Sequence, residues 1–490
     1  MFPTLFFSCV ASENLIGSIP IELRSLSSLV RLNLAMNSLV GSIPSELGSI
    51  ASLEVFEASA NFLTGPLPES IFYPPNMVTI DLRTNAIEGT LPASLSNATS
   101  LRQLLLADNL LGGKIPRFIG ESTSLEAFYI WSNSFRGSLP EFNPLSPMWF
   151  LSLGENELSG TIPASLTVLS DLQVLVLRGN AMSGPIPPFS GRFGSLRILD
   201  ISNRALTGNF GEILATLSPN NLDTLDFSTS MVSGTLPSTI GDFRVLNRLW
   251  LHDTRLGGTL PSELGRLSGL TDSINFNNCG LSGTLPTELG QLSLAYSLYV
   301  ASNNLNGTIP SEIGMMNSLA VFEAAHNDLS GTVPTEVGNC RRLEEFGIFG
   351  NGRVNGKLSD LVNVLPPSTR ALYLGELALT GSIPSSIGRL TLLERFFASE
   401  NALTGTLPTE FGNLRSMVFL NVFGNLLNGT IPGNLGLMTE LTDLSLGFNS
   451  LTGTVPQEFQ TLRSLIKLDL SGNGLTGPAG FLSTLPSLSE

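Results

Sequence analysis

The chain has 490 residues, of which 42% are hydrophobic and only 13% are charged, with a formal net charge of −15. This acidic balance excludes nucleic acid and anionic membrane surfaces as expected partners. No run of the sequence reaches the ~18 apolar residues of a transmembrane helix, so we expect no direct membrane insertion within this chain.

The first twelve residues admit two interpretations. Residues 1–12 are apolar like a signal peptide, but no basic residue precedes the apolar stretch. In the register of the repeats that follow, Leu5 and Val10 occupy leucine positions of a strand. We therefore favour a partial first repeat over a signal-peptide remnant for residues 1–12.

Residues 13–480 repeat one pattern, L-x-x-L-x-L-x-x-N-x-L-x-G-x-I/L-P, about twenty times. The glycines of the pattern, from Gly17 to Gly477, are most often 24 residues apart. A period of this length indicates a solenoid, in which each coil buries its apolar face against its neighbours. The expected fold class is an α/β repeat solenoid forming one domain, and residues 481–490 start a further, truncated repeat.

The segment Leu29–Pro44 illustrates the expected coil. Its alternating polar and apolar residues are typical of a strand with one buried face, on which Leu32 and Leu34 point inward. Gly41 permits a backbone conformation or a close approach that a side chain would obstruct. Pro44 then keeps the chain extended before a short helical or 3₁₀ stretch.

An asparagine ends the strand in fourteen of the coils. Its side-chain amide both donates and accepts hydrogen bonds, so stacked asparagines are expected to support one another as a ladder. The ladder residues are Asn37, Asn61, Asn85, Asn109, Asn133, Asn156, Asn180, Asn303, Asn327, Asn351, Asn401, Asn425, Asn449 and Asn473. Four successive coils carry Arg204, Ser230, Thr254 and Cys279 there instead, and we expect Cys279 to be a small buried ladder residue and not a redox group.

Two irregular coils, near 209–233 and 352–380, lose the proline of the pattern and gain residues. Their apolar residues are spaced as on a helix, in Ile213, Leu214 and Leu217 and again in Leu361, Val362 and Leu365. Each irregular coil is therefore predicted to carry a true helical turn on its outer side.

The motif L-x-G-x-I-P following L-x-x-L-x-L-x-x-N resembles the plant-type leucine-rich repeat, found in ectodomains of receptor-like kinases, in receptor-like proteins and in polygalacturonase-inhibiting proteins. Its Thr-rich form, as in residues 307–314, is similar to proteins of this class in diatoms and related algae. The resemblance covers essentially the whole chain. It implies a right-handed superhelix with parallel strands on the concave face, short 3₁₀ or helical turns on the convex side, and ligand binding as the usual role. The chain departs from these ectodomains in lacking paired cysteines for an N-terminal cap and any recognisable C-terminal cap, which leaves receptor status open.

Residues that carry catalytic chemistry are sparse. The two histidines, His252 and His326, lie three coils apart, too far to share a metal ion or a catalytic centre. The three cysteines form no metal-ligand or disulfide-dense spacing, and the glycine-rich residues 350–357 lack the strand-to-helix context of a phosphate loop. No catalytic residue, metal site or cofactor is expected, and a kinase domain could exist only outside this chain.

The outward strand positions, which form the concave face, are the expected binding surface. Aromatic residues gather there in two groups, and the candidate ligand-binding residues are Phe349, Tyr373, Phe397, Phe419, Phe423, Tyr129, Trp131 and Trp250. A row of exposed aromatic residues favours a binding role, because these side chains would otherwise be stabilised by burial in the core. The alternative interpretation is that they only pack on one another. Acidic residues of this face, including Glu323 and Glu345, outnumber basic ones such as Arg395.

The sequence thus predicts non-catalytic recognition of a protein, peptide or glycan ligand by a receptor ectodomain or secreted binding protein. The expected location is extracellular or at the cell surface, with membrane association only through a segment outside this chain. Glycosylation sequons at Asn97, Asn306 and Asn428 are compatible with secretion. The repeat itself contains x-G-T, however, so any asparagine before that glycine creates a sequon by chance. A structural or adhesive cell-wall protein and an intracellular scaffold are the alternatives, and a co-receptor or self-association is left open.

Overall fold

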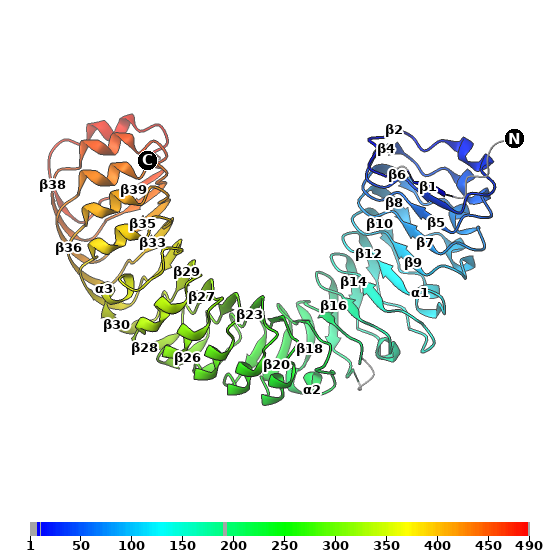
Figure 1. The fold of residues 1–490 in the computed structure, drawn as a ribbon, viewed down its shortest axis with the longest axis horizontal. Coiled ribbons are helices and arrows are strands. Elements are labelled where there is room, and N and C mark those ends of the chain that lie inside the picture. The colour runs from blue at the N-terminus through cyan, green and yellow to red at the C-terminus, as the bar shows by residue number, and fades with distance from the viewer. Residues whose placement is uncertain (1–6, 10, 190–193, 489–490) are drawn as a thin grey trace. The chain divides into compact units, whose positions relative to one another are not determined.

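The computed structural model describes residues 7–9, 11–189 and 194–488 of the chain. It forms two compact units, residues 1–233 and residues 234–490, which we describe separately. Both units consist of stacked coils of the same kind (Figure 1). The predicted α/β repeat solenoid is therefore confirmed, whereas one continuous domain over 13–480 stays a prediction.

In the first unit, each coil contributes one strand to each of two parallel sheets and, in most coils, a short helix. The strands of the first sheet are β1 (Phe7–Cys9), β3 (Arg31–Asn33), β5 (Val55–Glu57), β7 (Thr79–Asp81), β9 (Gln103–Leu105), β11 (Ala127–Tyr129), β13 (Phe150–Ser152), β15 (Val174–Val176), β17 (Ile198–Asp200) and β19 (Thr224–Asp226). The second sheet contains β2 (Ile16–Gly17), β4 (Ser38–Gly41), β6 (Phe62–Pro66), β8 (Ala86–Thr90), β10 (Leu110–Gly113), β12 (Ser134–Gly137), β14 (Glu157–Gly160), β16 (Ala181–Pro185), β18 (Ala205–Asn209) and β20 (Met231–Thr235). The helices are the 3₁₀ turns η1 (Ile21–Ser25), η2 (Ser45–Ser49), η3 (Glu69–Phe72), η4 (Ala93–Asn97) and η5 (Ala164–Val168) and the α-helical turns α1 (Arg117–Glu121) and α2 (Phe210–Leu214).

The second unit repeats this plan. The strands of its first sheet are β21 (Arg248–Trp250), β23 (Ser273–Asn275), β25 (Ser297–Tyr299), β27 (Val321–Glu323), β29 (Glu345–Gly347), β31 (Ala371–Tyr373), β33 (Arg395–Phe397), β35 (Phe419–Asn421), β37 (Asp443–Ser445) and β39 (Lys467–Asp469). The remaining strands are β22 (Arg255–Gly257), β24 (Ser282–Thr284), β26 (Asn304–Gly307), β28 (Asp328–Thr332), β30 (Arg353–Lys357), β32 (Ala378–Gly381), β34 (Ala402–Thr406), β36 (Leu426–Thr430), β38 (Ser450–Gly453) and β40 (Gly474–Leu475). The helices are η6 (Ser238–Asp242), η7 (Ser262–Arg266), η8 (Thr287–Gln291), η9 (Ser311–Met315), η10 (Thr335–Asn339), α3 (Leu358–Val362), η11 (Ser385–Arg389), η12 (Thr409–Asn413), η13 (Gly433–Leu437), η14 (Gln457–Thr461) and η15 (Gly480–Thr484).

The coil of residues 29–49 shows how the pattern folds. Leu32 and Leu34 are buried, at 1% and 6% exposure, as their alternation predicts. Gly41 has φ +80°, a left-handed conformation that favours glycine, and Pro44 is extended (φ −65°, ψ 132°) immediately before η2. The core of each unit is therefore a continuous column of inward leucine, isoleucine and phenylalanine side chains, one layer per coil.

The asparagines connect each coil to the preceding one. The Asn61 Oδ1 atom accepts a hydrogen bond from the Leu39 N–H at 2.9 Å, and its Nδ2 group donates to the Leu34 and Ala58 carbonyls at 3.0 and 3.1 Å. The same pattern recurs along both units, for example at Asn327. Because these groups lie in the interior, each asparagine satisfies buried backbone atoms of its own coil and of the preceding one.

The interruption of the ladder is shorter than the sequence predicts. Arg204 was expected at a ladder position, but Arg204 is exposed and Asn203, at 2% exposure, takes the position. Asn203 Oδ1 accepts from the Asn180 N–H at 2.9 Å, and its Nδ2 donates to the Leu177 carbonyl at 3.2 Å. The prediction placed the ladder residue four residues before the glycine of the repeat. This coil has one extra residue between the asparagine and Gly208, so the prediction was wrong by one residue.

Ser230, Thr254 and Cys279 are buried ladder residues, as expected for Cys279. Each donates to a carbonyl of the interior, and the Cys279 Sγ–H donates to the Leu251 carbonyl at 3.0 Å. Burial raises the pKa of the Cys279 thiol to about 11, so the group is protonated at neutral pH.

Both irregular coils carry the predicted helical turns, α2 and α3, whose predicted apolar residues are all buried. A third α-helical turn, α1, was not predicted; Arg117 and Glu121 form a salt bridge across it at 2.5 Å. At the N-terminus, β1 pairs in parallel with β3, so that Ser8 lies opposite Leu32. Leu5 and Val10, on which the prediction of a partial first repeat rests, lie outside the described residues. In the described part of the chain, no helix is both long and apolar enough to cross a membrane.

Candidate functional site

The outward side chains of the first sheet form a surface in each unit that we call the strand face. In the second unit, two rows of positions cross this face in register from strand to strand. One row contains Glu345, Ala371, Arg395 and Phe419; the next contains Glu323, Gly347, Tyr373 and Phe397. The regular spacing of parallel strands, ~4.8 Å, therefore fixes the distances between these side chains.

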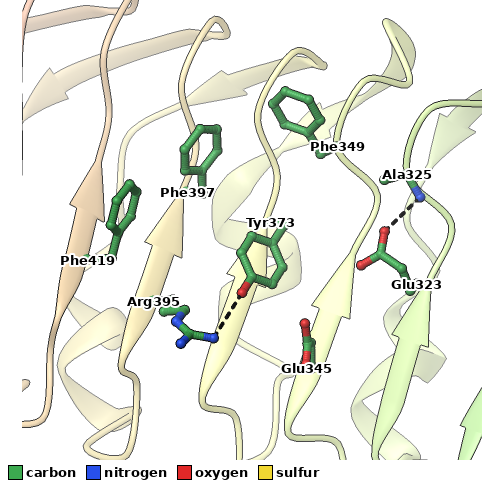
Figure 2. Close-up of a pocket in the computed structure, with 8 residues that line it drawn as sticks. All are labelled: Glu323, Ala325, Glu345, Phe349, Tyr373, Arg395, Phe397 and Phe419. Atoms are coloured by element: carbon green, nitrogen blue, oxygen red, sulfur yellow. Dashed lines mark hydrogen bonds between the residues drawn. The ribbon is translucent and has the colours of Figure 1, made fainter. Parts of the chain in front are cut away.

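A pocket of about 550 Å³ opens on this strand face, over strands β27 to β35. It brings together four of the predicted ligand-binding residues, which Figure 2 shows with the polar groups at its edge. The lining residues are Glu323, Ala325, Glu345, Phe349, Tyr373, Arg395, Phe397 and Phe419.

Half-buried phenylalanine rings form one wall of the pocket. The rings of Phe349 and Phe397 meet edge to face with their centroids 5.5 Å apart, and Phe397 stacks on Phe419 at 5.8 Å. His326 packs edge-on against the outer side of Phe349 at 5.0 Å. These contacts hold the rings in place while leaving part of each one exposed to the pocket.

Two glycines, Gly347 at the end of β29 and Gly375 two residues after β31, create the space for these side chains. A Cβ atom at Gly375 would lie 2.8 Å from the Phe349 ring and 2.9 Å from the Ser399 hydroxyl, so the ring lies directly over Gly375. A Cβ atom at Gly347 would overlap the Glu323 carboxylate. The absence of two side chains thus leaves room for the Phe349 ring and the Glu323 carboxylate.

The polar groups of the pocket are divided between its two ends (Figure 2). Glu323 and Glu345 lie at the β27–β29 end, where the Glu323 carboxylate accepts a hydrogen bond from the Ala325 N–H at 3.0 Å. Burial, together with the nearby charge of Glu345, raises the pKa of Glu323. At the other end, Arg395 donates to the Tyr373 hydroxyl at 3.5 Å, a contact that raises the pKa of the Arg395 guanidinium.

The structure places the other predicted ligand-binding residues outside this pocket. Phe423 packs on Phe448 at 5.1 Å. In the first unit, Tyr129 meets Phe150 edge to face at 5.5 Å. The two tryptophans are covered by arginines: the Arg178 guanidinium lies 4.5 Å from the Trp131 ring and that of Arg248 lies 4.5 Å from the Trp250 ring.

Comparison with known proteins connects this architecture to a family. The family model for the Leucine Rich Repeat matches residues 28–50 and 440–462, and none of the curated proteins matches the sequence. The plant peptide hormone receptor RGFR1 in complex with RGF2 shares 30% sequence identity over 96% of this chain and 83% of that one, with a TM-score of 0.76. The chain belongs to the plant-type leucine-rich repeat family.

Two further ectodomains of plant receptor kinases from Arabidopsis are similar to this leucine-rich repeat chain. That of HAESA, in complex with an IDA peptide hormone ligand, shares 28% identity over 97% of this chain and 85% of that one, with a TM-score of 0.85. That of GASSHO1/SCHENGEN3, in complex with CASPARIAN STRIP INTEGRITY FACTOR 2, shares 30% identity over 98% of this chain, with a TM-score of 0.76. This leucine-rich repeat chain spans 66% of the GASSHO1/SCHENGEN3 ectodomain.

A second cavity of about 560 Å³ lies in the first unit of the leucine-rich repeat chain, but it is polar. Its lining includes Arg102, which donates to the Glu126 carboxylate at 2.7 Å, so the arginine of this cavity is already paired. No group of three potential metal ligands occurs among the described residues of either unit. The pocket on the strand face of the second unit is therefore the candidate binding site.

Sequence analysis did not identify Gly347 and Gly375 as part of the site. The signal was present in the sequence, because both are glycines at outward positions where most other coils carry side chains. Phe349 and Gly375 occupy equivalent positions of successive coils, so the ring of one coil lies beside the glycine of the next. Trp131 and Gly154 show the same relation, since a Cβ at Gly154 would lie 2.7 Å from the Trp131 ring.

Proposed function

We propose that this leucine-rich repeat chain is a non-catalytic receptor that recognises an extended peptide on the strand face of its second unit, residues 234–490. The observation that carries this proposal is the pocket itself: three phenylalanine rings and a tyrosine remain open to solvent beside two carboxylates. Aromatic side chains at the centre of a contact supply most of its binding free energy. The peptide complexes of RGFR1 and HAESA support the choice of a peptide as ligand class.

The proposal places the protein outside the cell. The sequon asparagines Asn97, Asn306 and Asn428 are all exposed in the structure, so an oligosaccharide would fit at each without disturbing the core. A glycosidase treatment of the protein from its natural source should lower its apparent mass. An unchanged mass would instead favour the intracellular scaffold.

Selection from a library of displayed random peptides tests the proposed function. We expect enrichment of peptides that bind the wild-type chain. Binding to the Tyr373→Ala and Phe397→Ala double variant should be roughly 1000-fold weaker, because two rings that contribute about 2 kcal/mol each amount to about 4 kcal/mol. The matched control is Phe448→Ala, which removes a ring of the same unit that is 59% exposed and does not line the pocket. Thermal unfolding of each variant shows whether the fold is retained.

Two results would contradict the proposed function. One is the absence of any enriched peptide. The other is equal binding of the enriched peptides to wild type, to the double variant and to the control, which would favour a structural or adhesive protein whose aromatic rings only pack on one another.

A further inference from the structure

The Glu323 and Glu345 carboxylates of the pocket have no basic partner among the residues that the structure describes. No lysine, arginine or histidine nitrogen in the described part of the chain lies within 4 Å of either carboxylate. Glu323 is also removed from water by the surrounding residues, and the two negative charges oppose each other. A cation supplied by the ligand would relieve both effects.

The aromatic residues beside these carboxylates favour the same kind of ligand. Aromatic faces carry negative electrostatic potential and attract a cation placed over them. Phe349 contacts Gly375 and is partly open to the pocket, and Tyr373 and Phe397 also line it. Rings and carboxylates together therefore form a pocket for one cationic group.

The chain itself contains the proposed contact at two other places. In the first unit, the Arg178 guanidinium covers Trp131 and lies 3.5 Å from the Glu155 carboxylate. In the second unit, Arg248 covers Trp250 and donates to the Asp272 carboxylate at 2.7 Å. At both places an arginine of the chain fills the space between an aromatic ring and a carboxylate, whereas the pocket has the ring and the carboxylates without that arginine.

Arg395, the basic residue that lines the pocket, does not fill this role. It lies two strands from Glu345 in the same row, roughly 10 Å at the usual spacing of strands, and it is directed to the Tyr373 hydroxyl. Arg395 therefore restricts a cationic guest to the β27–β29 end of the pocket, beside Glu323 and Glu345.

We infer that the pocket binds the side chain of an arginine in the peptide ligand, with its guanidinium stacked on the aromatic wall and paired with Glu323 and Glu345. Arginine fits better than lysine because its planar guanidinium stacks on rings, pairs with a carboxylate through two parallel hydrogen bonds and is less strongly hydrated. The inference rests on the proposed function, since it names the side chain by which the same pocket selects its peptide.

Four libraries of acetylated and amidated pentapeptides test this inference. Their central residue is arginine, citrulline, lysine or leucine, and the remaining positions hold mixtures of neutral residues. Citrulline has the shape of arginine without its charge. We expect the arginine library to bind the wild-type chain at least tenfold more tightly than the citrulline library and severalfold more tightly than the lysine library, as measured by competition with a labelled arginine peptide.

A double variant, Glu323→Gln with Glu345→Gln, should abolish the preference for arginine over citrulline. The control variant, Glu376→Gln with Glu400→Gln, removes the same number of charges from neighbouring coils, at residues that do not line the pocket. We expect this control to keep the preference.

The outcomes separate the two proposals. Equal binding of the arginine and citrulline libraries, with both weakened by Phe397→Ala, would overturn the arginine inference and leave peptide recognition standing. Equal binding of arginine and lysine would overturn the role of stacking by the guanidinium. Failure of all four libraries to bind would overturn peptide recognition as well.

Discussion

Replacing Asn425 by alanine should weaken the second unit only locally. Asn425 is 6% exposed. Its Oδ1 atom accepts a hydrogen bond from the Leu403 N–H at 3.0 Å, and its Nδ2 group donates to the Ala398 and Val422 carbonyls at 2.9 and 3.1 Å. Alanine removes all of these bonds and offers no donor or acceptor in their place.

The cost of this substitution depends on which backbone groups lose their last partner. The Ala398 carbonyl also accepts from Asn401 at 3.3 Å, and the Val422 carbonyl also accepts from Asn449 at 3.0 Å. Both carbonyls therefore keep one hydrogen bond. The Leu403 N–H loses its acceptor, and one buried donor without a partner costs about 1–3 kcal/mol.

Hydrogen exchange followed by mass spectrometry can measure this cost coil by coil. A loss of 1–3 kcal/mol in local stability corresponds to about 5- to 150-fold faster exchange where opening is local. We expect the increase in the coils around Asn425, and none around Asn61, because each coil of a solenoid contacts only its neighbours.

The control for Asn425→Ala is Asn355→Ala. Asn355 is exposed, and its side chain makes one long hydrogen bond, to the Arg353 carbonyl at 3.4 Å. This control should leave exchange unchanged. A uniform rise along the chain, or equal effects of the two substitutions, would refute a ladder that stabilises each coil separately.

Three further predictions concern single positions. Burial and the charge of Asp226 raise the pKa of Asp200 to about 6 from 3.8, so the ionised carboxylate destabilises the fold above pH 6 and not below pH 4; Asp200→Asn should raise the free energy of unfolding in urea by up to about 3 kcal/mol at pH 8 and leave it unchanged at pH 3.5. The Cys279 and Cys340 thiols, with pKa values of about 11, should react with iodoacetamide at pH 8 roughly 100-fold more slowly than in the unfolded chain, and equal rates in peptide mapping would contradict their burial. Gly375→Ala should displace the Phe349 ring and weaken binding of the arginine library severalfold with little change in melting temperature, and unchanged affinity would show that the ring position is irrelevant.

The repeat pattern predicts the coil well because the same physical constraint recurs in every copy. Leu32 and Leu34 are buried because alternate residues of a strand point to the same side, and here that side is the core. Gly41 has the positive φ that the backbone needs at this place in the coil. Counting residues fails only where a coil changes length. Asn203 is the example, because an extra residue moves the asparagine out of the counted register and puts Arg204 in its apparent place.

The candidate site could be predicted only in part. Strand register places Phe349, Tyr373 and Phe397 on one surface, and the structure gathers them in one pocket. Register alone cannot show that Trp131 and Trp250 are covered by arginines. Their covering depends on the conformation of the long arginine side chains, which register does not determine. Equivalent outward positions in the sequence therefore differ in the surface that they offer a ligand.

The difference between the covered Trp131 ring and the open Phe349 ring comes down to a single position in the coil. Trp131, Gly154 and Arg178 occupy the position two residues before the ladder asparagine in three successive coils, and the arginine covers the ring. Phe349, Gly375 and Ser399 occupy the equivalent position in another three coils, the middle one of which has Leu377 in place of the asparagine. Serine is too short to reach over the ring, so the space that Arg178 fills in the first unit stays open in the second. A solenoid thus sets its binding chemistry by substitution at outward positions, because its backbone stays constant from coil to coil.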